Sequence, residues 1–382
     1  MKSKTTILAS FIVFLFSVPL PVFTEDGGSQ GASMPLCLPG IYNEVPAGCQ
    51  VLGPSEYLTR WATAGITFPV THLPAQPLDE SFSELPYFYV KVQKNIVLPV
   101  YTSQEDATGK VNPHHYIDKG LVYVSYIQRM GNFYMIDQGI WIRGGDTAGG
   151  AVLSPFRGLR FAGTPELKFG WIMSATETQR EPGSNSPKLT GHTLNRYDVV
   201  QVYDTRDADG VKWYLIGPDE WIEGYLAALV YPSSAPPEGV VNGRWIEINL
   251  IEQTVSVYEN NHLVFATLVS TGVDGWWTRP GLFQVFEKLE STLMRGAFES
   301  DRSDYYYLED VPWTMYFDEK RALHGAYWHN FFGYKQSHGC ANLSPGDARW
   351  LYEWAQLGDY VYVWDPTGET PTDPSLYKSG AP

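Results

Sequence analysis

The sequence predicts a mainly β protein, in which two small β units precede a larger β domain that has one notable helix. Three observations support this fold class. Glycine and proline number 36 and 27 in 382 residues, and aromatic residues make up 15%, a mixture typical of short strands and turns. One sequence frame occurs twice in the middle of the chain, at 133–144 and at 213–224. A Pro/Ser-rich stretch at 233–239 then separates this repeated part from a segment of different texture.

The start of the chain, at 1–24, predicts an export signal. Lys2 and Lys4 precede an almost wholly apolar run at 6–18, and Pro19 interrupts the apolar stretch. A basic start followed by a short apolar run is typical of a secretory signal peptide. An uncleaved membrane anchor is the alternative, because the stretch from 5 to 23 approaches the length of a membrane-spanning helix. Either form predicts an exported protein of the cell envelope, periplasmic or extracellular.

Residues 25–84 form a Pro/Gly-rich segment that contains two of the three cysteines. In an oxidising compartment Cys37 and Cys49 can pair, which leaves Cys340 unpaired. Lys and Arg together number 27 against 42 for Asp and Glu, so the net charge is −15. Because nucleic-acid binding depends on basic side chains that neutralise phosphates, this charge argues against a nucleic-acid partner.

The repeated frame reads aromatic-Tyr-x-Ile, four residues, then Trp-Ile-x-Gly, at 133–144 and again at 213–224. Each copy predicts two strands joined by a tight turn, and further strand candidates precede each copy. We therefore expect two β units at 85–150 and 160–232, with a long polar loop at 176–188. The pattern resembles bacterial SH3-like β-barrels, which implies either binding of glycan or cell wall by the repeats or a role as spacers.

The last part of the chain predicts a third domain at 240–365. Alternating or apolar runs predict its strands, at 244–250, 254–258, 263–271, 282–286 and 360–364. Ser344 and Pro345 predict the start of a helix, because Ser is a good N-cap and Pro is tolerated at the first helical position. Residues 366–382 are polar and Pro-rich, and we expect a flexible tail there.

Reactive residue types converge between 324 and 342, where three of the eight histidines lie beside the unpaired Cys340. A cysteine attacks as the thiolate, so it needs a neighbouring base, which a histidine can provide. Gly339 allows close approach of the backbone, and the N–H groups at 339–340 can face a developing oxyanion. The segment therefore predicts a cysteine nucleophile that a histidine activates.

The sequence Ser-His-Gly-Cys-x-Asn at 337–342, preceded by a His-Gly pair at 324–325, resembles the L,D-transpeptidase (YkuD-type) family. The segments at 270–281 and 312–317 also resemble that family, although Arg279 and Pro280 depart from its usual order. The resemblance covers about 240–365. It implies a YkuD-type β-sandwich domain that uses no cofactor and no metal.

The resemblance implies a role for each matching residue. Cys340 is the expected nucleophile and His324 the general base and acid, oriented by the backbone carbonyl of Gly325. The family acylates its cysteine with a peptidoglycan stem peptide, releases a terminal D-alanine and transfers the acyl group to an amine. Carbapenem-type β-lactams are the inhibitors that the resemblance implies.

Further residues of the site follow from the same resemblance. Ser337 and His338 are expected to shape the site, and Gly339 with Cys340 to supply the oxyanion donors. Asn342 is expected to support substrate binding. Aromatic side chains are candidates for the walls of an acceptor groove, namely Trp276, Trp277, Trp313, Tyr316, Tyr327 and Trp328; of these, Tyr316, Tyr327 and Trp328 are expected to bind substrate. Ordinary packing in the β domain is the alternative for each one.

Other functions remain open on the sequence alone. His324, His329, His338 and Cys340 are residue types that hold zinc, but their spacing matches no usual zinc template, and a lone loop histidine such as His329 is usually exposed. A papain-like endopeptidase has its cysteine before its histidine, whereas His324 precedes Cys340 here. A non-catalytic wall-binding protein would have a decayed site, and the complete residue set argues against decay. If water replaces the amine, the same site is an L,D-carboxypeptidase.

Overall fold

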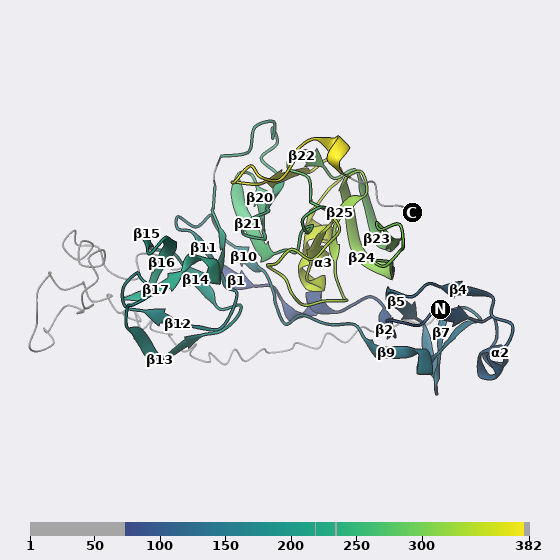
Figure 1. The fold of residues 1–382 in the computed structure, drawn as a ribbon. Helices are drawn as coiled ribbons and strands as arrows, with labels where there is room; N and C mark the ends of the chain where they lie inside the picture. The colour runs from purple at the N-terminus through teal and green to yellow at the C-terminus, as the bar shows by residue number, and fades with distance from the viewer. Residues whose placement is uncertain (1–72, 218, 234, 378–382) are drawn as a thin grey trace, which may run out of the picture.

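The computed structural model describes residues 73–217, 219–233 and 235–377. These residues are mainly β, as the composition predicted, and two α-helices occur among them, α2 (Gln104–Gly109) and α3 (Pro345–Trp354). Figure 1 shows the strands of the two β units on opposite sides of the region that carries the candidate catalytic residues. We call residues 85–150 the first β unit, 160–232 the second β unit and 240–365 the catalytic region.

One seven-stranded sheet forms the first layer of the catalytic region. Its order is β1 (Ala75–Pro77), β10 (Leu159–Phe161), β21 (His262–Leu268), β20 (Thr254–Glu259), β19 (Trp245–Asn249), β27 (Tyr360–Trp364) and β22 (Gly281–Gln284). The meander predicted from alternation forms its centre, and β27 runs parallel to β19 with Val361 opposite Ile246. Strands β1 and β10 extend this sheet with segments from outside the catalytic region.

A second sheet carries the candidate catalytic residues and continues into the first β unit. Its order is β26 (Ala341–Leu343), β25 (Arg321–Gly325), β24 (Tyr306–Asp318), β5 (Leu121–Tyr126), β2 (Phe88–Val92) and β9 (Thr147–Gly150), and β23 (Glu287–Gly296) also pairs with β24. Strand β5 runs parallel to β24, with Leu121 opposite Tyr306. The first β unit therefore shares a sheet with the catalytic region, which its predicted boundaries did not suggest.

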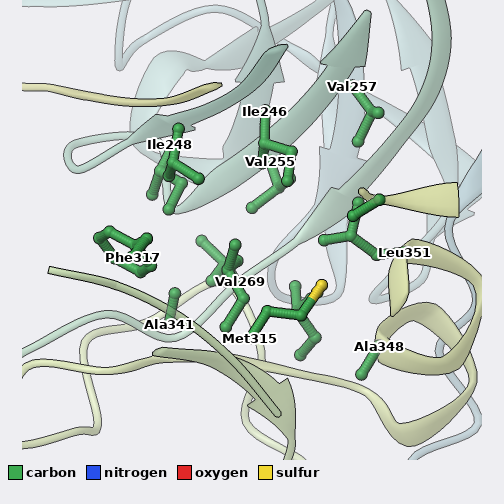
Figure 2. Packing of buried hydrophobic residues seen from close by; sticks show 14 of the residues in the cluster. Ile246, Ile248, Val255, Val257, Val269, Met315, Phe317, Ala341, Ala348 and Leu351 are labelled. Atoms are coloured by element: carbon green, nitrogen blue, oxygen red, sulfur yellow. The ribbon is translucent and has the colours of Figure 1, made fainter. Parts of the chain in front are cut away.

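The two sheets and α3 enclose one buried core. Ile246 and Ile248 of β19 point into it because alternate residues of a strand face the same side, and they meet Met315 of β24 (Figure 2). Ala348 and Leu351 of α3 complete the cluster, and all five side chains are fully buried. Burying a side chain the size of Ile, Leu or Met stabilises the fold by about 1.5–3 kcal/mol. This core holds the strands that carry the site in a fixed position.

Helix α3 begins where the sequence predicted. Ser344 is its N-cap, and the Ser344 side chain accepts a hydrogen bond from the N–H of Asp347, while Pro345 occupies the first turn. Asp347 is fully buried, and its carboxylate accepts hydrogen bonds from Oγ1 of Thr267 at 2.6 Å and from the N–H of Gly158 at 2.8 Å. The start of the helix is thereby bonded to β21 and to the segment before β10.

The remainder of the first β unit consists of short elements around a small core. They are β3 (Leu98–Val100), β4 (His115–Ile117), β6 (Gln128–Met130), β7 (Phe133–Asp137), β8 (Ile140–Arg143) and the 3-10 turn η2 (Gly144–Asp146), together with α2. The two strands predicted from the repeated frame are present as β7 and β8, with Tyr134 opposite Ile142. No closed SH3-like barrel is found in the described residues, because β2, β5 and β9 belong to the sheet of the catalytic region.

The second β unit has two sheets of its own. The smaller sheet contains β14 (Val199–Gln201), β11 (Phe169–Ile172) and β18 (Ala227–Val230). The larger contains β13 (Lys188–Leu194), β12 (Thr176–Gln179), β17 (Glu220–Glu223), β16 (Val211–Gly217) and β15 (Asp204–Ala208), and η3 (Gly224–Leu226) leads into β18. The predicted loop at 176–188 is wrong at both ends, because β12 pairs with β13 there. Neither sheet closes into a barrel within the part of the unit that the structure describes.

The described ends of the chain pack on the catalytic region. Near the N-terminal end, η1 (Glu80–Ser83) contacts α3, and Arg349 donates to the carbonyl oxygen of Ser81 at 3.2 Å. Near the C-terminal end, η4 (Pro374–Leu376) precedes Tyr377, whose ring centre lies 4.6 Å from the guanidinium carbon of Arg321. Tyr377 thus packs on the catalytic region, and the flexible tail expected at 366–382 stays a prediction.

Two predictions for the N-terminal part fall outside the described residues. These are the export signal at 1–24 and the pairing of Cys37 with Cys49. Within the described ranges, none of the helices has both the length and the apolar character needed to cross a membrane.

Candidate active site

Two adjacent parallel strands bring the candidate nucleophile close to the candidate base. Strands β25 and β26 pair with His324 opposite Asn342 and Leu323 opposite Ala341. Cys340 directly precedes β26, and its side chain is two positions from that of Asn342. Since side chains two apart along an extended chain point to the same face, Cys340 and Asn342 face the same way. The pairing explains how His324 and Cys340, which the loop between β25 and β26 separates in the sequence, meet at one place.

A cavity of about 190 Å³ lies where these strands end. Its polar lining includes His324, Ser337, His338, Cys340 and Asn342. Its apolar and aromatic lining includes Leu121, Phe298, Tyr306, Leu308 and Trp328. The cavity therefore collects most of the site residues predicted from the sequence, and one of its walls comes from β5 of the first β unit.

Cys340 is half-buried, and backbone groups surround its thiol. Its Sγ lies 3.8 Å from the carbonyl oxygen of Lys320, to which the S–H can donate. Burial raises the pKa of the Cys340 thiol, and the N–H of Ala322 and the charge of Arg321 oppose that rise in part. At neutral pH the resting cysteine is therefore protonated, and it needs a base to become a nucleophile.

His324 is buried beside the backbone carbonyl of Gly325. Its Nδ1 lies 3.4 Å from that carbonyl oxygen. Burial lowers the pKa of His324 to about 4, with a small opposing contribution from the Gly325 carbonyl and a further lowering by His329. The imidazole is therefore neutral at pH 7. With its proton on Nδ1 toward Gly325, Nε2 keeps a lone pair that can accept a proton.

The Ser337 side chain forms hydrogen bonds to the backbone at Gly339 and Cys340. Its Oγ accepts a hydrogen bond from the N–H of Gly339 at 3.1 Å and donates to the carbonyl oxygen of Cys340 at 2.5 Å. Gly339 has a positive φ of 120°, which favours glycine. Because Ser337 already takes the Gly339 N–H, the expectation that this N–H faces an oxyanion is not met in this geometry. The Ser337 hydroxyl, two residues before Gly339, competes with an oxyanion for this N–H group, and the motif alone did not reveal this competition.

His338 belongs to an aromatic cluster at one side of the cavity. Its ring lies nearly parallel to Phe298, at 4.8 Å and 12°, and to Tyr306, at 5.8 Å and 10°. Trp276 meets the same imidazole at 4.8 Å in an edge-on arrangement. Burial lowers the pKa of His338, and Asp304 opposes that shift. His338 therefore presents a neutral ring within an aromatic wall at pH 7.

Tyr327 is not available to a substrate, so the prediction that it binds substrate is wrong. Its side chain is fully buried, and its ring stacks on Tyr89 of the first β unit with 3.7 Å between centres. Its hydroxyl donates to the carbonyl oxygen of Glu309 at 2.5 Å. The position of Tyr327 in the sequence, close to the candidate base His324, did not reveal this role, because the ring packs against β2, a strand that is remote in the sequence.

The other aromatic candidates differ in position. Trp328 lines the cavity, and its ring lies 5.6 Å from that of His324. Tyr316 does not line the cavity, although a charge on Cys340 would raise its pKa further. Trp313 belongs to the buried core, and Trp277 packs against Tyr377 of the C-terminal segment. Only Trp328 among the three expected substrate-binding aromatics reaches the cavity.

Several residues at the cavity were not predicted. Leu121 comes from the first β unit, and Tyr306 and Phe298 flank His338. Arg321 lines the cavity beside Cys340 and pairs with Asp318 at 3.2 Å. The sequence could have indicated Arg321, since it lies in the strand that contains His324. No local sequence pattern indicates Leu121, because only the parallel pairing of β5 with β24 brings it to the site.

His329 also lies at the site, in contact with Asn342. The terminal nitrogen of the Asn342 carboxamide is 3.1 Å from Nε2 of His329. Asn342 is buried and lines the cavity. Among the described residues, no group of three or more His, Cys, Asp or Glu side chains is arranged to hold a metal ion.

Comparison with known proteins assigns the catalytic region. Residues 243–363 match the YkuD family, whose description is L,D-transpeptidase catalytic domain. The resemblance noted in the sequence is therefore confirmed for these residues. The match leaves the two β units outside it.

The relatives match this chain over limited lengths. L,D-transpeptidase 2 of Mycobacterium tuberculosis is 29% identical over 121 residues, which are 30% of this chain and 30% of the relative. Putative L,D-transpeptidase YciB of Bacillus subtilis is 23% identical over 127 residues, 28% of this chain and 59% of the relative. The chain thus spans less than two thirds of either relative.

A solved structure is also similar over part of the chain. It is an L,D-transpeptidase (Yku) from Stackebrandtia nassauensis, 28% identical, with 35% of this chain and 60% of that chain covered and a TM-score of 0.27. Because this TM-score is low, we draw no conclusion about fold or function from it.

Proposed function

We propose that this chain is a peptidoglycan L,D-transpeptidase with Cys340 as its nucleophile. One observation carries the proposal: Cys340, His324 and Ser337 line a single cavity, and all three belong to the segment that matches the catalytic-domain family. The neutral thiol and the neutral imidazole fit a resting pair that exchanges a proton only when substrate is bound. No metal or cofactor takes part in the proposed steps.

In the first step, Cys340 is acylated by the donor stem peptide. Nε2 of His324 removes the thiol proton, and the sulfur attacks the carbonyl carbon of the peptide bond before the terminal D-alanine. The carbon–sulfur bond forms, and the carbonyl π electrons move to oxygen. When the tetrahedral intermediate collapses, the carbon–nitrogen bond breaks and His324 returns the proton to the departing D-alanine nitrogen. The product is a thioester on Cys340.

In the second step, an amine of another stem peptide resolves the thioester. His324 accepts a proton from the attacking amine, the new carbon–nitrogen bond forms, and the thiolate leaves and regains that proton. The two steps thus exchange one amide for another without net oxidation. The hydrogen bonds of Ser337 to Gly339 and to the Cys340 carbonyl hold the cysteine backbone fixed through both steps. With the Gly339 N–H engaged, the Cys340 N–H is our candidate for the oxyanion.

The site of action and the wider partners belong to the same proposal. The basic and apolar start of the chain supports export to the cell envelope. We also propose that the β units hold glycan or wall polymer near the cavity, which co-sedimentation of the Cys340→Ala protein with purified sacculi would test. Carbapenem-type β-lactams should acylate Cys340, because their strained carbonyl can take the place of the donor peptide bond.

The test is mass spectrometry of the products formed from tetrapeptide-stem muropeptides. The full chain should yield a cross-linked dimer that has lost one D-alanine, and Cys340→Ala should yield none. Tripeptide products without a dimer would replace the proposal with an L,D-carboxypeptidase. If neither product forms and a carbapenem leaves the mass of the folded protein unchanged, the enzyme proposal is wrong and a wall-binding role takes its place.

A further inference from the structure

The Asn342 side chain has one terminal atom without a partner at the wall of the active-site cavity. Asn342 is only 3% exposed, and it lines the cavity together with His324 and Cys340. One end of its carboxamide is 3.1 Å from Nε2 of His329. The other end, the atom placed as Oδ1, is buried and has no hydrogen-bond partner among the described residues. Leaving a buried polar atom unpaired costs about 1–3 kcal/mol, so this atom indicates a ligand.

The surroundings of His329 fix which of its nitrogens carries the proton. The backbone N–H of Phe331 points at Nδ1 over 3.3 Å. A backbone N–H can only donate, so Nδ1 must offer a lone pair. Burial lowers the pKa of His329 to about 4, so the ring is neutral at pH 7 and has one N–H. That N–H is therefore on Nε2, the nitrogen that faces Asn342.

A protonated Nε2 requires an acceptor opposite it. Rotating the Asn342 carboxamide by about 180° exchanges its oxygen and nitrogen almost in place, and only the hydrogen-bond network decides between the two orientations. With the nitrogen toward His329, two donors would face each other. With the oxygen toward His329, the contact is a normal hydrogen bond and the amide NH₂ occupies the unpartnered position at the cavity.

We propose that His329 is a positioning residue that holds Asn342 with its NH₂ group directed into the active-site cavity, as a hydrogen-bond donor to an oxygen of the acyl-donor peptide. The inference rests on the proposed function and adds a specificity-determining pair to it. Asn342 lies opposite His324 in the strand pairing and lines the same cavity as the base and the nucleophile. Because Ser337 takes the Gly339 N–H, a donor at this place is chemically useful.

The orientation can be tested without any turnover. In the full chain labelled with ¹⁵N-histidine, the nitrogen shifts of His329, identified by comparison with His329→Phe, report which nitrogen is protonated. We expect the Nε2–H form at pH 7. The Nδ1–H form would overturn the proposal, because Asn342 would then donate to His329 and present its oxygen to the cavity. This measurement stands even if the proposed transpeptidase reaction fails.

The kinetics of two variants, one of Asn342 and one of His329, test whether Asn342 presents a hydrogen-bond donor to the substrate. Asn342→Asp keeps the size of the side chain and an oxygen for His329, but it replaces the NH₂ group with a carboxylate oxygen. The value of kcat/KM for the acyl-donor peptide should therefore fall about 100-fold, which is the effect of losing one hydrogen-bond donor of the oxyanion-hole type. Unchanged or higher kcat/KM would mean that the substrate presents an N–H here, which overturns the proposal. His329→Phe keeps the ring contact with Phe332, 4.9 Å between centres, but removes the donor to Asn342.

The coupling between the two residues separates positioning from a merely structural role. His329→Phe should lower kcat/KM about tenfold, and His329→Gln, whose amide can donate to the Asn342 oxygen, should restore it to within about threefold. In the Asn342→Asp background, His329→Phe should have almost no further effect, since both act through one contact. Full additivity of the two losses would show that His329 acts independently of Asn342 and would contradict the proposal.

Discussion

The two β units share a sequence frame, yet they meet the catalytic region through different kinds of contact. The first β unit adds β5 to the sheet of the catalytic region by parallel pairing with β24, and its Leu121 lines the cavity of Cys340. Apart from β10 at its start, which pairs with β21, the second β unit keeps its own sheets and contacts the region through side chains, such as the Tyr197 hydroxyl that donates to the carbonyl of Asn330 at 3.0 Å. Neither copy of the repeated frame lines the cavity itself, and the first unit reaches the cavity through β5, which precedes its copy of the frame.

A partly buried glutamate of the catalytic region lies at each junction. Glu309 accepts a hydrogen bond from the N–H of Ser125 in the first β unit at 3.0 Å. Glu252 accepts from the N–H of Leu229 in the second at 2.8 Å and from the hydroxyl of Tyr231 at 2.9 Å. Each unit is therefore joined by a glutamate side chain, and each also contributes to a sheet of the catalytic region: β5 of the first unit pairs with β24, and residues 160–161 at the start of the second unit belong to β10, which pairs with β21. The difference lies in what each shared strand does: β5 brings Leu121 to the cavity, whereas no residue of β10 lines it.

The largest effect is expected at the aromatic contact of the first β unit. Tyr327→Ala removes a fully buried ring stacked on Tyr89 and should lower the free energy of unfolding by about 3–5 kcal/mol. The corresponding Tyr197→Ala, at the half-buried contact of the second unit, should cost less. Chemical unfolding measures both. Equal losses would contradict the tighter integration of the first unit, and Tyr327→Phe, which keeps the stack, is the control.

Two glycines provide a matched pair for the backbone contacts. A Cβ on Gly120 would lie 2.1 Å from the carbonyl oxygen of Tyr305, where β5 joins β24, and a Cβ on Gly170 would lie 1.9 Å from that of Ala228, inside the second unit. Each alanine substitution should destabilise the protein by about 1–3 kcal/mol.

The consequences for Cys340 should nevertheless differ between the two variants. Gly120→Ala displaces β5 and should slow acylation of Cys340 by a carbapenem about tenfold, a factor that corresponds to about 1.4 kcal/mol in the barrier. Gly170→Ala should leave the rate within about twofold, because no residue of its sheet lines the cavity. If the folded Gly170→Ala protein is also acylated slowly, the expected difference between the two variants is wrong.

The junction glutamates should give the smallest effect, visible as a pH dependence. Burial raises the pKa of Glu309 from 4.5 to about 7 and also raises that of Glu252. Each folded state therefore favours the protonated acid, so this contribution to stability is present below pH 4.5 and is lost as the pH rises, through about 7 for Glu309. Glu309→Gln should reduce the stability lost between pH 5 and pH 8 by about 1 kcal/mol or more.

Urea unfolding at pH 5 and pH 8 checks the direction of this change in stability, with wild type, Glu309→Gln and Glu252→Gln compared. Glu252→Gln should act in the same direction, because its carboxyl shift has the same sign and the same leading cause. If Glu309→Gln becomes less stable than wild type on going to high pH, the carboxyl is ionised and paired in the folded protein, and this description of the junction is wrong.

Local patterns predicted much of the fold. The alternation in β19, the Ser344-Pro345 start of α3 and the turn between β7 and β8 all depend on neighbours in sequence, and each was found. The pairing of β5 with β24 was not predictable, because no local pattern specifies which strand joins a sheet edge. The strand β12 was also missed, since its residues Thr176–Gln179 are all polar and only their pairing with β13 and β17 makes them a strand.

The site was predicted as far as its motif is continuous in sequence. Cys340, His324 and Ser337 belong to one short segment, and the parallel pairing of β25 with β26 brings them to one cavity. Tyr327 was misassigned because an aromatic residue beside a motif can face either side of a sheet, and here it faces Tyr89. His329 was set aside as an isolated histidine, and only its contact with Asn342 gives it a role.

The measurement that tests this account most directly is the rate at which Cys340 is acylated when the cavity is filled from the first β unit. Leu121→Trp enlarges a lining residue, and Val199→Trp introduces the same side chain at a similarly exposed apolar position of the second unit. Intact-protein mass spectra with a carbapenem should show one adduct on wild type and none on Cys340→Ala. Leu121→Trp should slow the adduct at least about tenfold, while Val199→Trp changes it less than about twofold. Equal rates for the two variants would contradict a site built jointly by the first β unit and the catalytic region.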